Sequence, residues 1–249
     1  MAKKHYRRKE YDLYRSDGNR RLCLIIHGLG GNKGKSYWAD LAQLLRYDPK
    51  LANVDVCFWE FATSKRPLAN LLALFRRGRR ISTIPEVARS LDTVIKGLTA
   101  EYGYDEVALA GHSLGGAVAL LAAEYGVETG QGSKITDVCF MATPQSPPGV
   151  AKVAARVARW NPHISWLASK DVNAVMNVSL RNMRLCGIHS TYVHYTLDEL
   201  LPLAEEVEFD CRLDCEGEHG WPATVNNANT EAYRTLRDWI ANPRAAPHD

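Results

Sequence analysis

The chain has 249 residues, enough for one large domain with a substantial buried core. Its 31 Lys and Arg residues against 28 Asp and Glu residues leave a formal net charge of +3, which gives no argument for nucleic acid or an anionic membrane as a partner. Neither an apolar run of membrane-spanning length nor a signal-peptide core is present, so we expect an intracellular, cytoplasmic location.

The positive charge is concentrated in two clusters. The first lies on a polar N-terminal tail that we expect to be frayed and comprises Lys3, Lys4, Arg7, Arg8 and Lys9. The second comprises Arg76, Arg77, Arg79 and Arg80. Such a run is usually a solvated face. Association with a lipid surface through a basic amphipathic helix is the alternative interpretation.

Strand-like and helix-like segments alternate along the chain, which predicts an α/β fold with a mostly parallel sheet and helices on its faces. Leu22 to Ile26 is a continuous apolar run, as expected for a strand buried on both faces. Further strands are predicted at 54–61, 106–110, 135–141, 191–196 and 207–213. Helices are predicted at 36–45, 84–102, 118–123 and 231–240, the last with Thr230 or Asn229 as its N-cap. Residues 67–75 are a short Leu-rich stretch that runs into the second basic cluster.

Residues 144–190 interrupt this alternation. Several prolines stand at the start of the segment, and amphipathic helical patterns follow. Because a structureless loop of this length is unusual inside a domain, we interpret the segment as a helical cap inserted into a single domain that spans residues 1–249.

The cysteines indicate a reduced protein without a metal. Cys23, Cys57 and Cys139 lie in apolar strand-like runs, where a thiol behaves as a small hydrophobic group. Cys211 and Cys215 with His219 offer three soft ligands, but their spacing is not that of a usual structural zinc site. We therefore expect no metal at this position.

Residues 110–117 have the sequence Ala-Gly-His-Ser-Leu-Gly-Gly-Ala and join a predicted strand to a predicted helix. This is a G-x-S-x-G pattern in the strand–turn–helix context that exposes a nucleophilic serine. Gly111 and Gly115 allow the strand and the helix to cross closely, because neither carries a Cβ. Ser113 is the predicted nucleophile.

An activated serine needs a histidine base and an acid that orients it, and with this motif both follow the serine in the chain. His219 lies in a turn between the last predicted strand and the last helix, and is the predicted base. Asp198 comes just after a strand end and is the predicted acid. Glu199 competes with it, although an acid at a helix start is common as a capping charge. The remaining histidines after Ser113 and the other rival acids are His163, His189, His194, His248, Asp210 and Asp214.

Donors for the developing oxyanion are predicted on two loops. The segment His27-Gly28-Leu29-Gly30-Gly31 follows a strand and can direct a main-chain N–H toward the serine. The N–H groups of Leu29 and Leu114 are the predicted pair. His27 and His112 neighbour these turns, and we expect them to brace the loops by local hydrogen bonds.

Together, these motifs, the Ala142-Thr143-Pro144 turn and the Leu197-Asp198-Glu199-Leu200-Leu201-Pro202 segment resemble the serine esterase and lipase branch of the α/β-hydrolases, which includes GPI-inositol deacylases. The resemblance runs from about Leu22 to Ile240. It implies a sheet of the eight-stranded type, a Ser113, Asp198 and His219 triad, and hydrolysis of carboxylic esters without a cofactor. Residues 145–149 depart from the family pattern.

Apolar side chains of the predicted cap, Trp160, Trp166, Leu167 and Met176, suggest a small-molecule ester with an apolar acyl or aromatic group. The same stripe is expected if these residues only seal the cap onto the sheet. A thioesterase or an acyltransferase would use the same triad, and a binding protein on a hydrolase scaffold is a third interpretation. The sequence does not indicate an oligomeric state.

Overall fold

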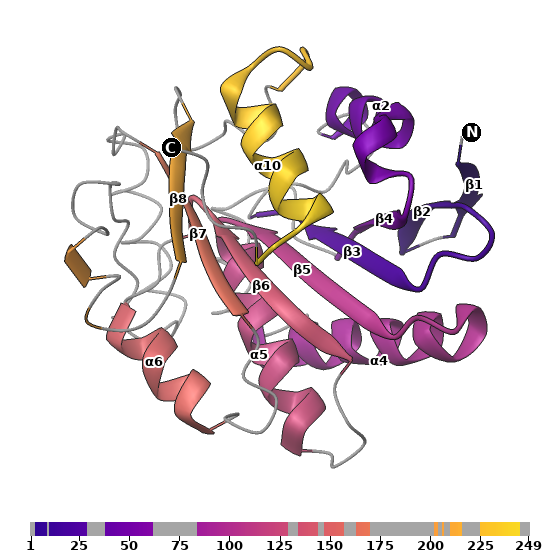
Figure 1. The fold of residues 1–249 in the computed structure, drawn as a ribbon. Coiled ribbons are helices and arrows are strands. Elements are labelled where there is room, and N and C mark those ends of the chain that lie inside the picture. The colour runs from indigo at the N-terminus through magenta and orange to yellow at the C-terminus, as the bar shows by residue number, and fades with distance from the viewer. Residues whose placement is uncertain are drawn as a thin grey trace, which may run out of the picture.

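The computed structural model describes residues 3–8, 10–28, 38–61, 84–128, 134–143, 147–156, 163–169, 202–203, 206, 210–215 and 225–244. Within these residues an eight-stranded sheet has helices on both faces (Figure 1). The strand order is β1-β2-β4-β3-β5-β6-β7-β8. The bounds are β1 Lys4–Arg7, β2 Tyr11–Arg15, β3 Arg21–Ile26, β4 Val54–Trp59, β5 Glu106–His112, β6 Ile135–Met141, β7 His163–Ser169 and β8 Asp210–Cys215.

The strands from β4 to β8 in this order are parallel, whereas β1 and β2 are antiparallel additions at one edge. The central strand β3 shows why the sequence has continuous apolar runs. Leu22, Leu24 and Ile26 pack into the core on one face of the sheet, and Cys23 and Ile25 pack into the core on the other. A strand covered on both faces carries apolar side chains at successive positions, and not only at alternate ones.

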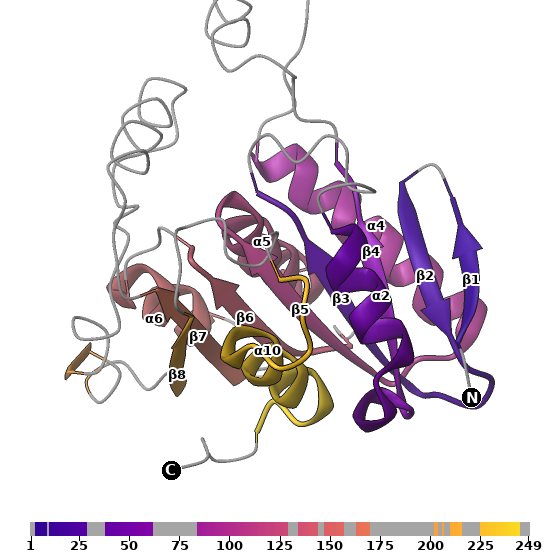
Figure 2. The same ribbon diagram turned by 90° about the horizontal axis from the view of Figure 1, so that it is seen from above.

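Helices α4 Ile84–Tyr102, α5 Leu114–Glu128 and α6 Pro147–Arg156 cover one face, and α2 Ala39–Tyr47 and α10 Glu231–Ala241 cover the other (Figure 2). A short 3-10 helix, η1 Pro49–Leu51, follows α2. The predicted helices 84–102 and 231–240 are confirmed, the second with a one-residue extension. Strand 135–141 is confirmed with the same bounds.

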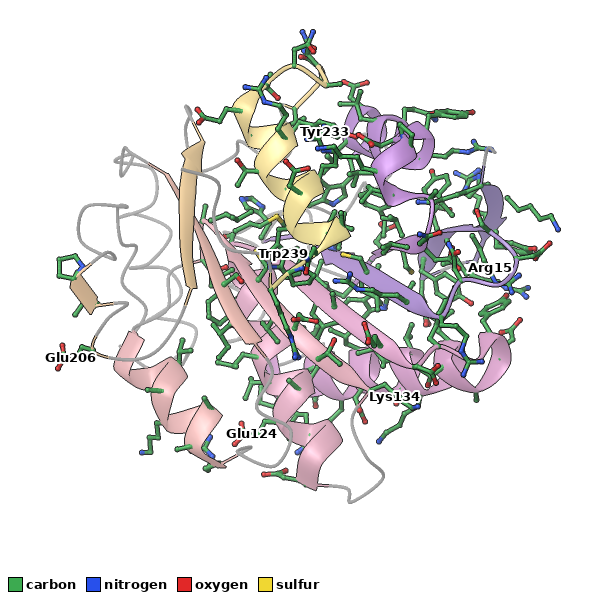
Figure 3. The ribbon with its side chains drawn as sticks, viewed as in Figure 1. Arg15, Glu124, Lys134, Glu206, Tyr233 and Trp239 are labelled. Atoms are coloured by element: carbon green, nitrogen blue, oxygen red, sulfur yellow. The ribbon has the colours of Figure 1, made fainter. Side chains whose placement is uncertain are left out.

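Helix α10 is held at its start and along its length. Its N-cap is Thr230, one of the two predicted candidates, and the Thr230 hydroxyl accepts from the Tyr233 N–H at 3.3 Å. The Tyr233 hydroxyl, on the side of α10 that faces α2, donates to Asp48 at 2.7 Å (Figure 3). The indole N–H of Trp239 donates to the hydroxyl of buried Ser165 on β7 at 3.0 Å. The polar contacts therefore fix α10 against both a loop and the sheet.

Two sequence-based expectations were wrong in part. Residues 163–169 of the expected helical cap form β7, which pairs with β6 in the sheet. Trp166 and Leu167 therefore lie on a strand, and the Leu167 side chain is fully buried in the core. A short apolar run in a sequence is compatible with either a helix or a strand. Here the pairing with the buried strand β6 makes residues 163–169 a strand. Helix α6 lies in the segment where cap helices are expected, but it packs on the face of the sheet that α4 and α5 also cover. Residues 170–190 lie outside the described residues, so the cap stays a prediction there.

The expected frayed N-terminus is the second correction, because residues 4–7 form β1 and pair with β2. Strand β1 is largely exposed, so no apolar pattern marks it in the sequence. Ionic contacts across the hairpin add to the backbone pairing, among them Lys4 to Asp17 at 2.6 Å.

The prediction of reduced core cysteines is confirmed for three positions. Cys23, Cys57 and Cys139 are buried and form no disulfide. Burial raises the pKa of the Cys23 thiol to about 12, so this group stays protonated and unreactive at neutral pH. Among the helices in the described part of the chain, none combines the length and the apolar composition that crossing a bilayer requires.

Candidate active site

The carboxyl ends of the parallel strands β3, β5 and β6 lie at the same edge of the sheet, and Ser113 lies among them, between β5 and α5. Its φ of 52° is in the left-handed region, which a residue with a side chain adopts at a cost of roughly 1–2 kcal/mol. The Ser113 N–H donates to the carbonyl of Met141 at the end of β6 at 2.9 Å. The strained turn is therefore held in place by the neighbouring strand, as expected for a nucleophile elbow.

Glycines make the close crossing of strand and helix possible. A Cβ on Gly111 would lie 2.4 Å from the Gly115 carbonyl group, and one on Gly115 would lie 2.5 Å from the carbonyl oxygen of Ile26 on β3. Both contacts are far shorter than real Cβ contacts and involve backbone that cannot move aside. The crossing of β5 with α5 therefore requires glycine at position 111, and the crossing of α5 with β3 requires glycine at position 115.

The loop that follows β3 reaches the serine. A Cβ on Gly28 would lie 2.8 Å from the Ser113 Cβ, so the Gly28 backbone lies directly against the serine side chain. Ser113 itself is 7% exposed. A loop at this position is where a main-chain donor for the oxyanion is expected.

His27 braces this loop, as the sequence suggested. Its Nε2 accepts from the Phe61 N–H at 3.2 Å, which makes Nδ1 the protonated nitrogen, and Nδ1–H donates to the Gly28 carbonyl at 2.7 Å. The ring stacks on Phe61 with centroids 4.2 Å apart. Burial lowers the pKa of His27, which favours the neutral ring that this pattern needs. With both ring nitrogens engaged, His27 is a structural histidine between the ends of β3 and β4.

His112 is also buried, and its ring contacts the Trp38 ring edge to face with centroids 6.1 Å apart. Trp38 precedes α2, so this contact connects the residue before the serine to the helices on one face of the sheet.

The structure brings together only part of the predicted site. Leu114 is the first residue of α5, where the N–H groups of a helix have no partner within the helix and the dipole favours negative charge. It directly follows Ser113 in the chain. The other predicted participants lie outside the described residues, and they are Leu29, Asp198, His219, Trp160 and Met176. Their roles remain predictions.

One contact of the elbow has no counterpart in the sequence-based site. Thr143, which follows β6, is buried, and its hydroxyl donates to the Gly111 carbonyl at 3.1 Å. The feature of the sequence that reflects this contact is Gly116, because a Cβ at that position would collide with the Thr143 side chain.

Within the part of the chain that the structure describes, no group of three or more His, Cys, Asp or Glu side chains is arranged to hold a metal ion. Cys211 and Cys215 both lie on β8, and His219 is outside the described residues.

The strand order, the elbow and the adjoining glycine loop define a hydrolase scaffold. The sequence matches the model of the alpha/beta hydrolase family over residues 23–245, so the chain belongs to that family. The fold and family expected from the sequence are thereby confirmed. A comparison with curated proteins finds no match to this sequence.

Solved structures share the fold along nearly the whole chain. A dienelactone hydrolase from Anabaena variabilis ATCC 29413 has a TM-score of 0.58 and 15% identity, over 96% of this chain and 98% of that chain. A lipase-esterase related protein from Clostridium acetobutylicum ATCC 824 has a TM-score of 0.56 and 11% identity, over 93% of this chain and 98% of that chain. An alpha-beta serine hydrolase homologue from Coxiella burnetii has a TM-score of 0.55 and 12% identity, over 98% of this chain and 99% of that chain. At these identities the likeness concerns the fold alone.

Proposed function

We propose that the protein is a serine hydrolase that cleaves carboxylic esters of small molecules through an acyl-enzyme on Ser113. The observation that carries the proposal is the left-handed Ser113, held between β5 and α5 by the hydrogen bond from its N–H to Met141 and by the close glycine packing of β5, α5 and β3. A fold tolerates a strained residue with a side chain where surrounding contacts enforce it, and such residues cluster at active sites. The family supports the reaction class, and esterases occur among proteins of the same fold.

In the proposed reaction, Ser113 Oγ attacks the ester carbonyl while His219 takes the hydroxyl proton, and Asp198 holds the imidazole in the required tautomer. The N–H groups of Leu114 and Leu29 stabilise the tetrahedral oxyanion. His219 then donates the proton to the leaving alcohol, and a water molecule that it activates releases the acid. No step requires a metal or an organic cofactor.

The described residues support the oxyanion part of this proposal most directly. Ser113 directly precedes the α5 N-terminus, and the Gly28 backbone lies against its side chain, so both segments to which the proposal assigns oxyanion donors adjoin the serine. Trp160, Trp166 and Met176 remain candidates for an apolar acyl pocket. Leu167 is assigned to the core of the sheet.

The proposal is tested with p-nitrophenyl esters of increasing acyl length, assayed with the wild type and Ser113→Ala. We expect wild-type turnover and a loss of at least about 10³-fold in the variant, because removing a triad nucleophile leaves only residual catalysis. Parallel assays with a thioester of the same acyl group compare the two leaving groups. Equal hydrolysis by the wild type and Ser113→Ala would refute the assignment, and a strong preference for the thioester would redirect it to a thioesterase.

A further inference from the structure

The turn that follows β6 repeats the backbone strain of the nucleophile. Among the described residues, Ser113 and Ala142 are the two non-glycine positions with positive φ, at 52° and 47°. They follow neighbouring strands, β5 and β6, and are connected because the Ser113 N–H donates to Met141. The Ala142 N–H donates to the carbonyl of Leu167 on β7 at 3.1 Å. Hydrogen bonds to the segments at the ends of β5 and β7 therefore hold Ala142 in a conformation that is unfavourable for alanine.

The consequence of this turn is the position of Thr143. The Thr143 side chain is 1% exposed, and its hydroxyl donates to the carbonyl of Gly111, two residues before the serine, at 3.1 Å. This bond fixes the strand side of the elbow.

The same side chain also contacts the helix side. A Cβ on Gly116 would lie 2.1 Å from Thr143 Oγ1 and 2.6 Å from its Cγ2, so Thr143 rests directly on the first turn of α5. The Gly116 N–H donates to the Ser113 carbonyl at 3.1 Å, which places this contact one hydrogen bond from the serine backbone. Thr143 thus touches both elements that the elbow joins.

We propose that Thr143 is a positioning residue for the nucleophile. Its hydroxyl holds the Gly111 carbonyl and its body packs on Gly116, so that Ser113 Oγ and the Leu114 N–H keep one relative geometry during acyl transfer. The strain at Ala142 serves to bring Thr143 to this position. The inference rests on the proposed function of Ser113 and extends it to a residue outside the triad and the oxyanion donors.

Three variants separate the hydroxyl from the packing. Thr143→Val keeps the shape and removes the donor, Thr143→Ser keeps the donor and removes the methyl group, and Thr143→Ala removes both. Thr99→Val is the control, since the Thr99 hydroxyl donates to a backbone carbonyl of α4, away from the site, at 2.9 Å. For each variant we would measure kcat and KM on a p-nitrophenyl ester, the inactivation rate with a fluorophosphonate, and the melting temperature.

We expect Thr143→Val and Thr143→Ala to lower kcat by roughly 10- to 100-fold with KM changed less than about twofold, because a small misplacement of a reacting group affects the rate more than binding. The inactivation rate should fall in parallel. Thr143→Ser should stay within about threefold of the wild type, and Thr99→Val should match it.

Two results would overturn the inference while leaving Ser113 as nucleophile. One is wild-type kcat and inactivation rate in both Val and Ala variants with only a lower melting temperature. The other is an equal loss of kcat in the Ser and Ala variants, which would show that the hydroxyl bond to Gly111 contributes nothing and that only packing on Gly116 matters; this comparison remains decisive if Thr143→Val does not fold. A wild type that neither hydrolyses esters nor reacts with the fluorophosphonate would instead refute the proposed function itself, and the role of Thr143 with it.

Discussion

Ser113 adopts a backbone conformation that favours glycine, yet the proposed chemistry needs its side chain. The left-handed φ directs the chain sharply from β5 into α5, and the bond from its N–H to Met141 holds it there. This strain lowers the stability of the folded protein and is compensated by the surrounding core. The free-energy cost of this backbone conformation for a residue with a side chain can be measured.

We predict that Ser113→Gly is more stable than Ser113→Ala by about 1 kcal/mol, since glycine adopts positive φ without a Cβ penalty and alanine does not. Both variants lack the hydroxyl, so the comparison isolates the backbone. Urea unfolding at pH 7 gives the two free energies of unfolding. An alanine variant as stable as the glycine variant would show that position 113 is not strained.

The identity of the acid is a second question at the residue scale. An orienting carboxylate fixes the imidazole tautomer, so Asp198→Asn should lower kcat by about 10²–10⁴-fold with little change in folding. Glu199→Gln should change the rate far less, because a charge at a helix start contributes only about 0.3–1 kcal/mol to stability. Steady-state kinetics of both variants on one soluble ester decide the matter. A collapse of kcat in Glu199→Gln alone would move the acid by one residue.

At the scale of elements, the N-terminal hairpin buries a cation. Lys3, next to β1, is 2% exposed, and within the described residues its ammonium group has no hydrogen-bond partner. Burial lowers the pKa of Lys3 to about 8, although the carboxylates of Asp55 and Asp48 act in the opposite direction. Below pH 8 both the folded and the unfolded chain carry the proton, and the folded protein bears the full desolvation cost. As the pH rises from about 8 to 10.5, only the unfolded chain retains the proton, and the free energy of unfolding increases.

We therefore predict that Lys3→Met raises the free energy of unfolding at pH 7, by an amount on the order of 2 kcal/mol. The gain should shrink as the pH rises from 8 to 10.5. Lys4→Met is the control, since Lys4 is exposed and its pair with Asp17 is of the surface kind that contributes little. Urea titrations at pH 7, 9 and 10.5 test the prediction. A destabilised Lys3→Met at pH 7 would mean that the lysine is stabilised by its surroundings.

The elements that sequence predicted best are those whose environment is uniform along their length. Helix α4 has one apolar face, and β6 is buried along nearly all of its length, so a single periodicity describes each of them. Strand β7 was missed because its conformation is determined by pairing with β6, and the pattern of its own sequence fits a helix as well as a strand. Strand β1 was missed because edge strands are polar, and backbone pairing with β2, which no apolar pattern reveals, holds it in place.

At the scale of the whole molecule, the parallel strands bring the ends of β3, β5 and β6 to one edge of the sheet, and motifs far apart in the sequence meet there (Figure 1). The elbow and the His27 brace could be predicted because their chemistry is local to a turn. The contact of Thr143 with Gly111 and Gly116 could not, because it depends on how the end of β6 crosses α5. Asp198 and His219 remain predictions from chain order.

The central claim is that Ser113 is the nucleophile of an acyl-transfer reaction. The most direct measurement is peptide mapping by mass spectrometry after reaction of the native protein with a fluorophosphonate, with Ser113→Ala treated in parallel. The expected result is one adduct per chain, on the peptide that contains residues 111–117, with inactivation proportional to labelling and no adduct in the variant. Hydrolysis of esters by a protein that is labelled at another residue, or that remains fully active after complete labelling of Ser113, would contradict it.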